Sequence, residues 1–275
     1  MSVHTVAFLS LAALSAYLDL FPLATRALFW LGGIQFANSI APKLPFPRLI
    51  HWAHAMTFEL LALCGVALLR FVPTTHAVYG NKQPILLVHG YLNHGSVWLL
   101  FKRHLQRKGL GPIYTINLGH PFRSIRFYAE RVKAKAEDIA LETGRKDLIL
   151  IGHSMGGLVS SLYATCLAPP NTVTDVITIG SPLNGTPMAR VGIGPNAREM
   201  QPSSALVQEV RAKMAQRPDI RFFHLATKSD QLVIPGTSAV IPEHRNFIFE
   251  DLGHASMLYS RRASDQIAEW LQDIG

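Results

Sequence analysis

The sequence predicts an α/β protein built on a doubly wound, mostly parallel sheet. From residue 81 onward, short runs of apolar and β-branched residues alternate with longer amphipathic runs. This alternation is typical of βαβ units, which give parallel strands. The short runs are nearly continuous in apolar residues, as expected when helices cover both faces of the sheet. A more uniformly apolar segment comes first, so we expect two parts, residues 1–80 and residues 81–275.

The expected strands and helices alternate along the second part. The strands are the short apolar runs at residues 85–89, 113–117, 148–152, 176–179, 221–226 and 246–250. The helices are expected at residues 96–108, 124–143, 155–166, 203–215 and 255–274. Residues 187–202 are rich in Gly and Pro, and we expect them to form an irregular insertion. Because this insertion is short, any lid over a binding site is either small or contributed by the N-terminal segment.

Residues 1–80 are interpreted as hydrophobic helices that anchor the chain in a membrane. Residues 3–23 and 49–72 approach the roughly 20 apolar residues that cross a bilayer, and only four of the 26 Lys and Arg residues precede residue 73. Glu59 argues against a span, because a carboxylate in mid-membrane is costly unless it faces another helix or an aqueous cavity. A hydrophobic cap packed on the second part, or a pair of interfacial helices, stays an alternative.

Charge and composition indicate which classes of binding partner to expect. A net charge of +8 suits an anionic partner. The basic residues are scattered along predicted helices without the interleaved aromatic residues of a nucleic-acid groove, so we expect a lipid surface and no nucleic acid, with a solvated basic surface as the alternative. Cys64 and Cys166 do not make a disulfide framework. No metal-ligand cluster or phosphate-binding loop is present in the pattern, so we expect no metal and no cofactor.

Ser154 is the candidate nucleophile. The apolar run at residues 148–151 leads directly into Gly152-His153-Ser154-Met155-Gly156, and a helix is expected to follow. A Gly-x-Ser-x-Gly sequence between strand and helix makes a sharp turn that lifts the serine hydroxyl above the sheet. The alternative is that the serine only caps the helix.

Two backbone amides are candidates for an oxyanion hole. The N–H of Met155 lies at the positive end of the helix after the serine, where developing negative charge is stabilised. The second donor should come from the loop after the first strand, which ends in His89-Gly90-Tyr91. We therefore expect the N–H of Tyr91 to be that donor, and His89 to shape the loop by hydrogen bonding.

A serine hydroxyl needs a histidine to accept its proton and a carboxylate to orient that histidine. Asp230 follows the strand at 221–226, and His254 follows the strand at 246–250. Their order after Ser154 is that of the nucleophile-elbow enzymes. The competing residues lie within a strand, before a strand or too close to His254: they are His224, His244, Asp219 and Asp251.

Together these stretches resemble bacterial triacylglycerol lipases and esterases of the α/β-hydrolase superfamily. The resemblance is carried by residues 88–91, 152–157 and 179–186 and by Ser229-Asp230 and Gly253-His254. Leu183 stands where the family usually has a histidine. The resemblance implies an α/β-hydrolase fold and carboxylic ester hydrolysis through an acyl-enzyme, with an acyl lipid or other apolar ester as substrate. It does not cover residues 1–80, and it is the apolar character of this segment that leads us to expect a place at a membrane, the bacterial inner membrane.

Two other functions stay open. A thioesterase or amidase would use the same residues, because the motif does not specify the leaving group. A protein of another class, in which a membrane-bound fold serves as a binding or scaffold module, would leave the three residues idle. The intact elbow and the chain order of the acid and base favour an enzyme.

Overall fold

The computed structural model describes residues 59, 61–66 and 82–272 of the 275-residue chain. The apolar stretch at residues 3–23 lies outside the described residues, as does most of the stretch at 49–72. Within the residues that are described, no helix combines the length and the apolar character needed to span a membrane.

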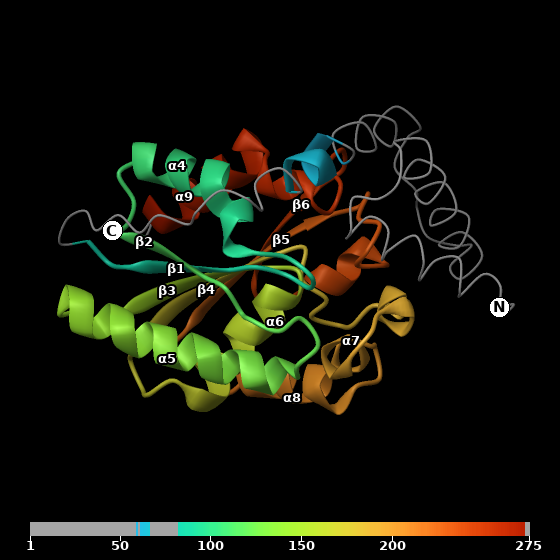
Figure 1. Cartoon of the computed structure of the whole chain (residues 1–275), viewed down its shortest axis with the longest axis horizontal. Helices are drawn as coiled ribbons and strands as arrows, with labels where there is room; N and C mark the ends of the chain where they lie inside the picture. Colours follow the sequence, from blue (N-terminus) through green and yellow to red (C-terminus); the bar gives the residue numbers. More distant parts are fainter. Residues whose placement is uncertain (1–58, 60, 67–81, 273–275) are drawn as a thin grey trace, which may run out of the picture.

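A parallel sheet forms the centre of the described chain (Figure 1). Its strand order is β2-β1-β3-β4-β5-β6, and all neighbouring strands are parallel. All the predicted strands are present, and the largest error is at β4, which begins three residues earlier than expected. The bounds are β1 (Ile85–Val88), β2 (Ile113–Ile116), β3 (Leu148–His153), β4 (Val173–Ile179), β5 (Arg221–Thr227) and β6 (Arg245–Phe249).

Helices cover both faces of the sheet (Figure 1). One face carries α4 (Leu99–Arg107) and α9 (Arg261–Gln272), and the other carries α5 (Ile125–Thr143), α6 (Met155–Leu162) and α8 (Ala205–Met214). Because successive side chains of a strand point to opposite faces, Leu86 joins the core under α5 and α6, whereas Leu87 joins the core under α4 and α9. The predicted doubly wound architecture is confirmed.

Four helical segments differ from the prediction. The helix expected at 96–108 begins as a 3₁₀ turn (Gly95–Trp98) before α4. The insertion at 187–202 contains a 3₁₀ turn (Pro187–Val191) and a short helix, α7 (Pro195–Glu199). The helix expected at 155–166 ends in a π-helical turn (Tyr163–Leu167). The helix expected at 255–274 is interrupted, because a separate 3₁₀ turn (Ser256–Leu258) precedes α9. There the Ser256 hydroxyl accepts the N–H of Gly253 at 2.7 Å and closes the loop before α9.

A helical segment from the N-terminal part lies against this fold. Residues 61–66 are helical, Ala62 is 4% exposed, and Val66 packs against the core under α4 and α9. The contacts of residues 61–66 therefore agree with the alternative in which the N-terminal segment packs as a hydrophobic cap on the second part of the chain. The division at residue 80 stays a prediction.

Candidate active site

Ser154 occupies a sharp turn between β3 and α6. Its backbone has φ +54° and ψ −126°, a conformation that costs a non-glycine residue about 1–3 kcal/mol. The flanking glycines allow the turn: a Cβ on Gly152 would overlap the backbone of Gly156, and a Cβ on Gly156 would overlap the backbone of Val88. The strand and the helix therefore approach as the elbow sequence predicts.

The loop after β1 lies directly beside Ser154. A Cβ on Gly90 would lie 2.9 Å from the Ser154 Cβ, so the backbone that leads into Tyr91 passes next to the nucleophile. On the other side, Met155 is the first residue of α6, where a backbone N–H has no intrahelical acceptor. The structure thus brings both predicted oxyanion donors to the elbow.

The insertion is attached to the side chains of the same two residues. The Tyr91 hydroxyl donates to the Ile193 carbonyl at 2.8 Å and accepts the Ile193 N–H at 2.9 Å. The buried Asn196 amide donates to the Met155 sulfur at 3.5 Å and to the Pro121 carbonyl. The insertion at 187–202 is therefore in contact with the residues of the predicted oxyanion hole.

Asp230 and His254 form a buried pair. The His254 Nδ1 lies 2.8 Å and 3.0 Å from the two carboxylate oxygens of Asp230, and the side chains are 4% and 1% exposed. Asp230 Oδ1 also accepts the N–H groups of Leu232 and Val233 at 2.9 Å and 2.7 Å. These bonds fix the carboxylate, so it can hold the imidazole in one orientation.

Opposing effects act on the pKa of His254. Burial lowers this pKa, but the charge and the hydrogen bond of Asp230 outweigh burial, helped by the charge of Glu59, so the pKa is raised above its usual value. Because Nδ1 donates to Asp230, Nε2 is the nitrogen left to accept a proton. This is the arrangement required of a general base.

Gly180 joins the serine side of the site to the acid–base pair. Its φ is +53°, and a Cβ there would lie 3.2 Å from Asp230 Oδ2 and 3.3 Å from His254 Nδ1. The residue before it, Ile179, accepts the Ser154 N–H at 2.8 Å. Ser154 and the Asp230–His254 pair therefore lie on either side of Ile179 and Gly180, at the carboxyl edge of the parallel sheet.

His153 is a site residue that the sequence interpretation missed. Its Nε2 donates to the His254 carbonyl at 3.1 Å, and the two rings are 4.7 Å apart between centroids. Burial, and then the neighbouring His254, hold the pKa of His153 well below its usual value. His153 therefore acts as a neutral hydrogen-bond donor. Its place inside the elbow motif was the only available signal.

Glu59 and Gln231 also contact the loop of His254 and were not predicted. The Gln231 side chain accepts the His254 N–H at 3.2 Å. The Glu59 carboxylate accepts the N–H groups of Ala255 at 2.7 Å and Ser256 at 2.8 Å. A lone acid within an apolar stretch was the signal for Glu59, but nothing in the sequence identifies a partner 196 residues away.

His89 has the structural contacts expected of it. Its Nε2 accepts the Leu118 N–H at 3.1 Å, and its Nδ1 lies 2.9 Å from the Gly90 carbonyl. Burial lowers the pKa of His89 to about 4, so the ring stays neutral and supports the loop that carries Tyr91.

The acids and histidines that competed for the roles of Asp230 and His254 have other partners. His224 bonds to His244, and Asp219 and Asp251 pair with arginines, namely Arg217 and Arg262. Among the described residues no group of His, Cys, Asp and Glu could hold a metal ion.

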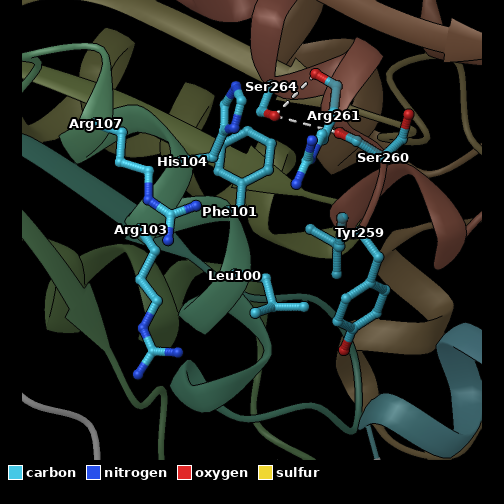
Figure 2. Close-up of a pocket in the computed structure, with 10 residues that line it drawn as sticks. Leu100, Phe101, Arg103, His104, Arg107, Tyr259, Ser260, Arg261 and Ser264 are labelled. Carbon is cyan, nitrogen blue, oxygen red and sulfur yellow. Dashed lines mark hydrogen bonds between the residues drawn. The ribbon is translucent and has the colours of Figure 1, made fainter.

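A basic pocket lies between α4 and α9 (Figure 2). None of Ser154, Asp230, His254, Tyr91 and Met155 lines it. Its lining comes from α4, from the segment before α9 and from the first turn of α9, and it includes Arg103, His104, Arg107, Tyr259 and Arg261.

Comparisons with known proteins identify the family of this chain. A model of the alpha/beta hydrolase family matches residues 85–270. The chain is 31% identical over 156 residues to a triacylglycerol lipase from Burkholderia plantarii, covering 52% of this chain and 41% of that protein. It is 33% identical over 118 residues to a triacylglycerol lipase from Pseudarthrobacter phenanthrenivorans, covering 40% of this chain and 36% of that one. The matched regions thus span about two fifths of these relatives.

Solved structures show the same fold. The mature form of a Bacillus licheniformis lipase superposes with a TM-score of 0.59 at 19% identity, over 72% of this chain and 95% of that one. Aspergillus fumigatus lipase B gives a TM-score of 0.63 at 13% identity, over 98% and 85%. With the family match, these findings confirm the predicted resemblance to lipase- and esterase-like α/β-hydrolases.

Proposed function

Because the chain belongs to the alpha/beta hydrolase family, we propose that it is a serine hydrolase that cleaves carboxylic esters. Ser154 is the nucleophile, His254 the general base and acid, and Asp230 the carboxylate that orients the imidazole. The backbone N–H groups of Tyr91 and Met155 bind the oxyanion. No cofactor takes part in this chemistry.

The reaction proceeds by two acyl transfers. His254 Nε2 accepts the Ser154 proton as the hydroxyl oxygen attacks the ester carbonyl, and the amides of Tyr91 and Met155 stabilise the resulting oxyanion. The intermediate collapses to an acyl-enzyme, and His254 gives the proton to the departing alcohol. Water, deprotonated by His254, then attacks the acyl-enzyme and releases the carboxylic acid.

The observation that carries the proposal is the Asp230–His254 pair beside a serine held in a strained conformation. The pair is buried and bonded at 2.8 Å, and Ser154 has a positive φ that simple helix capping does not require. Strain of this kind is found where a catalytic geometry needs it. An idle scaffold would have no use for either feature.

An acyl lipid or another apolar ester is the proposed substrate. Two relatives with sequence similarity are named triacylglycerol lipases, and the apolar residues 1–80 would bring the enzyme to a membrane lipid surface, as an inner-membrane-associated protein. Extraction of membranes with alkaline carbonate tests this association. We expect the full chain to stay in the membrane pellet, and its release into the supernatant would contradict the proposal.

Fluorophosphonate labelling tests the proposed chemistry. We expect the wild type to be labelled, Ser154→Ala to lose the label, and Ser203→Ala, which changes an exposed serine, to keep it. Hydrolysis of p-nitrophenyl esters of graded chain length, compared with a matched thioester, then identifies the preferred acyl group and leaving group. Absence of labelling in folded wild-type protein would refute the serine hydrolase and favour the scaffold.

A further inference from the structure

The Glu59 carboxylate is fully buried against the loop that carries His254. Its exposed fraction is 0%, and its two oxygens accept different backbone N–H groups, those of Ala255 and Ser256. Both hydrogen bonds favour the ionised form of the carboxylate, because they are stronger to a charged oxygen than to a neutral one. Glu59 therefore bonds to the two residues that directly follow His254.

Gly253 fits this contact as only a glycine can. A Cβ at this position would overlap the Glu59 carboxyl group. The Gly253-His254 sequence carries part of the family resemblance. In this structure a glycine is needed before the histidine because the missing side chain leaves space for the Glu59 carboxylate.

Other side chains hold the His254 peptide from different directions. Gln231 accepts the His254 N–H, and His153 donates to the His254 carbonyl. Gln231 comes from the Asp230 loop and His153 from the end of β3, while Glu59 comes from the N-terminal segment. The backbone around His254 is thereby fixed on three sides.

We propose that Glu59 is a positioning residue for His254, so that the N-terminal segment completes the active site of the hydrolase. The inference rests on the proposed roles of Ser154, Asp230 and His254. According to this proposal, the Glu59 carboxylate fixes the peptide groups that follow His254, so that the imidazole stays aligned between Asp230 and Ser154.

A carboxylate is well suited to this task. Hydrogen bonds from N–H groups to an ionised oxygen are roughly twice as strong as those between neutral groups. Glutamine has nearly the same shape but offers one oxygen and one NH₂, so one of the two backbone N–H groups would face another donor. The Glu59→Gln variant should therefore release one side of the loop and leave the packing nearly intact.

The negative charge of Glu59 also affects the pKa of His254. Asp230, His153 and Glu59 face the His254 imidazole, and Glu59 is itself faced by His254, Asp230 and Tyr259. Burial is the main cause that raises the pKa of Glu59. Its negative charge is one of the causes that raise the pKa of His254, so its removal should lower that pKa.

The test uses the full-length chain with Glu59→Gln and a matched control, Asp175→Asn. Asp175 is also a fully buried carboxylate, but it lies near the amino end of β4 and pairs with Arg221. We expect Glu59→Gln to lower kcat by about 10- to 100-fold with little change in KM, because small misplacements of a catalytic group have effects of this size. The acid limb of its kcat/KM profile should move to lower pH.

The control separates positioning from stability. Asp175→Asn should lower the melting temperature while keeping the kcat and the acid limb of the wild type. A second variant, Glu59→Asp, keeps the charge but shortens the side chain, so its kcat should fall while its acid limb stays nearer that of the wild type. The His254 Nδ1 proton resonance, followed by NMR, should shift in Glu59→Gln and not in Asp175→Asn.

Each other outcome overturns a defined part of the reasoning. Wild-type kcat and pH profile in Glu59→Gln, or changes no larger than those in Asp175→Asn, would refute the positioning role. If both Glu59 variants fail to fold while the control folds, Glu59 serves stability alone and the inference is wrong. Activity that persists in Ser154→Ala would instead refute the proposed function, whatever the Glu59 variants do.

Discussion

Asp230→Asn tests what the Asp230 carboxylate contributes to the proposed mechanism. Asparagine has the shape of aspartate and can still accept the N–H groups of Leu232 and Val233 through its oxygen. It lacks the negative charge that faces the His254 imidazole at 2.8 Å. With the oxygen in the place of Oδ1, the NH₂ group stands in the place of Oδ2, the atom nearest to His254 Nδ1. The substitution therefore removes both the stabilisation of the imidazolium and the acceptor that fixes the imidazole tautomer, while the loop stays in place.

The size of the effect follows from the separation and burial of the pair. Two unit charges about 4 Å apart interact by about 4 kcal/mol at an effective dielectric constant near 20. The side chains are only 4% and 1% exposed, so solvent screens the pair weakly. Because the imidazole is neutral before the attack and charged during it, this stabilisation acts on the barrier. A loss of about 4 kcal/mol corresponds to a kcat lower by about 1,000-fold.

The assay is p-nitrophenyl ester hydrolysis across pH, with a melting curve for each variant. Asp230 raises the pKa of His254, so its removal should move the acid limb of kcat/KM to lower pH while the plateau falls. Asp251→Asn is the matched control, because Asp251 lies three residues from His254 and pairs with Arg262 at the surface. A folded Asp230→Asn enzyme within about threefold of wild-type kcat would refute the reasoning, since that is under 1 kcal/mol.

Three further outcomes are expected from local contacts. Gly144 ends α5 with φ +69° and open space around it, so Gly144→Ala should cost about 1 kcal/mol from strain alone, lowering the melting temperature by about 2–4 °C with unchanged hydrolysis. At Gly157 an added Cβ would overlap the Ser181 hydroxyl, so Gly157→Ala should cost about 1–3 kcal/mol in urea unfolding, and an unchanged midpoint would contradict the packing described. Because the folded pKa of His254 is raised, its contribution to stability should be complete below about pH 6.5 and fade as pH rises through the folded pKa, which urea midpoints at acid and alkaline pH can follow in wild type and Asp230→Asn.

Local patterns were sufficient for the sheet and the elbow. A buried parallel strand must be apolar on both faces, so Leu86 and Leu87, which enter different cores, already mark β1 as a continuous apolar run. The elbow needs small residues at fixed spacing around Ser154, and the overlaps at Gly152 and Gly156 show why. Residues that follow strands of a parallel sheet meet at one edge, which is why the sequence alone predicts that Asp230 and His254 pair.

Features that depend on distant contacts escaped prediction. The turn Ser256–Leu258 separates from α9 in a loop where Ser256 bonds to Gly253 and to Glu59, and a helical periodicity contains no sign of such a partner. The contact of His153 with the His254 carbonyl joins two loops that are 101 residues apart. In each case the sequence contains both residues but gives no sign that they are in contact.

Glu59 shows how a misfit in a sequence pattern can mark a site. In a membrane span this carboxylate would lose its hydration without compensation, which is why it weighed against an anchor at residues 49–72. Against the loop of His254 its burial is compensated by two backbone N–H groups that the chain must satisfy in any case. An apolar residue at this position would bury as well but would leave both N–H groups unpaired beside the proposed general base. The acid in the apolar stretch is therefore better explained by the active site than by the membrane, and the kinetics of Glu59→Gln decide between a positioning role and a purely structural one.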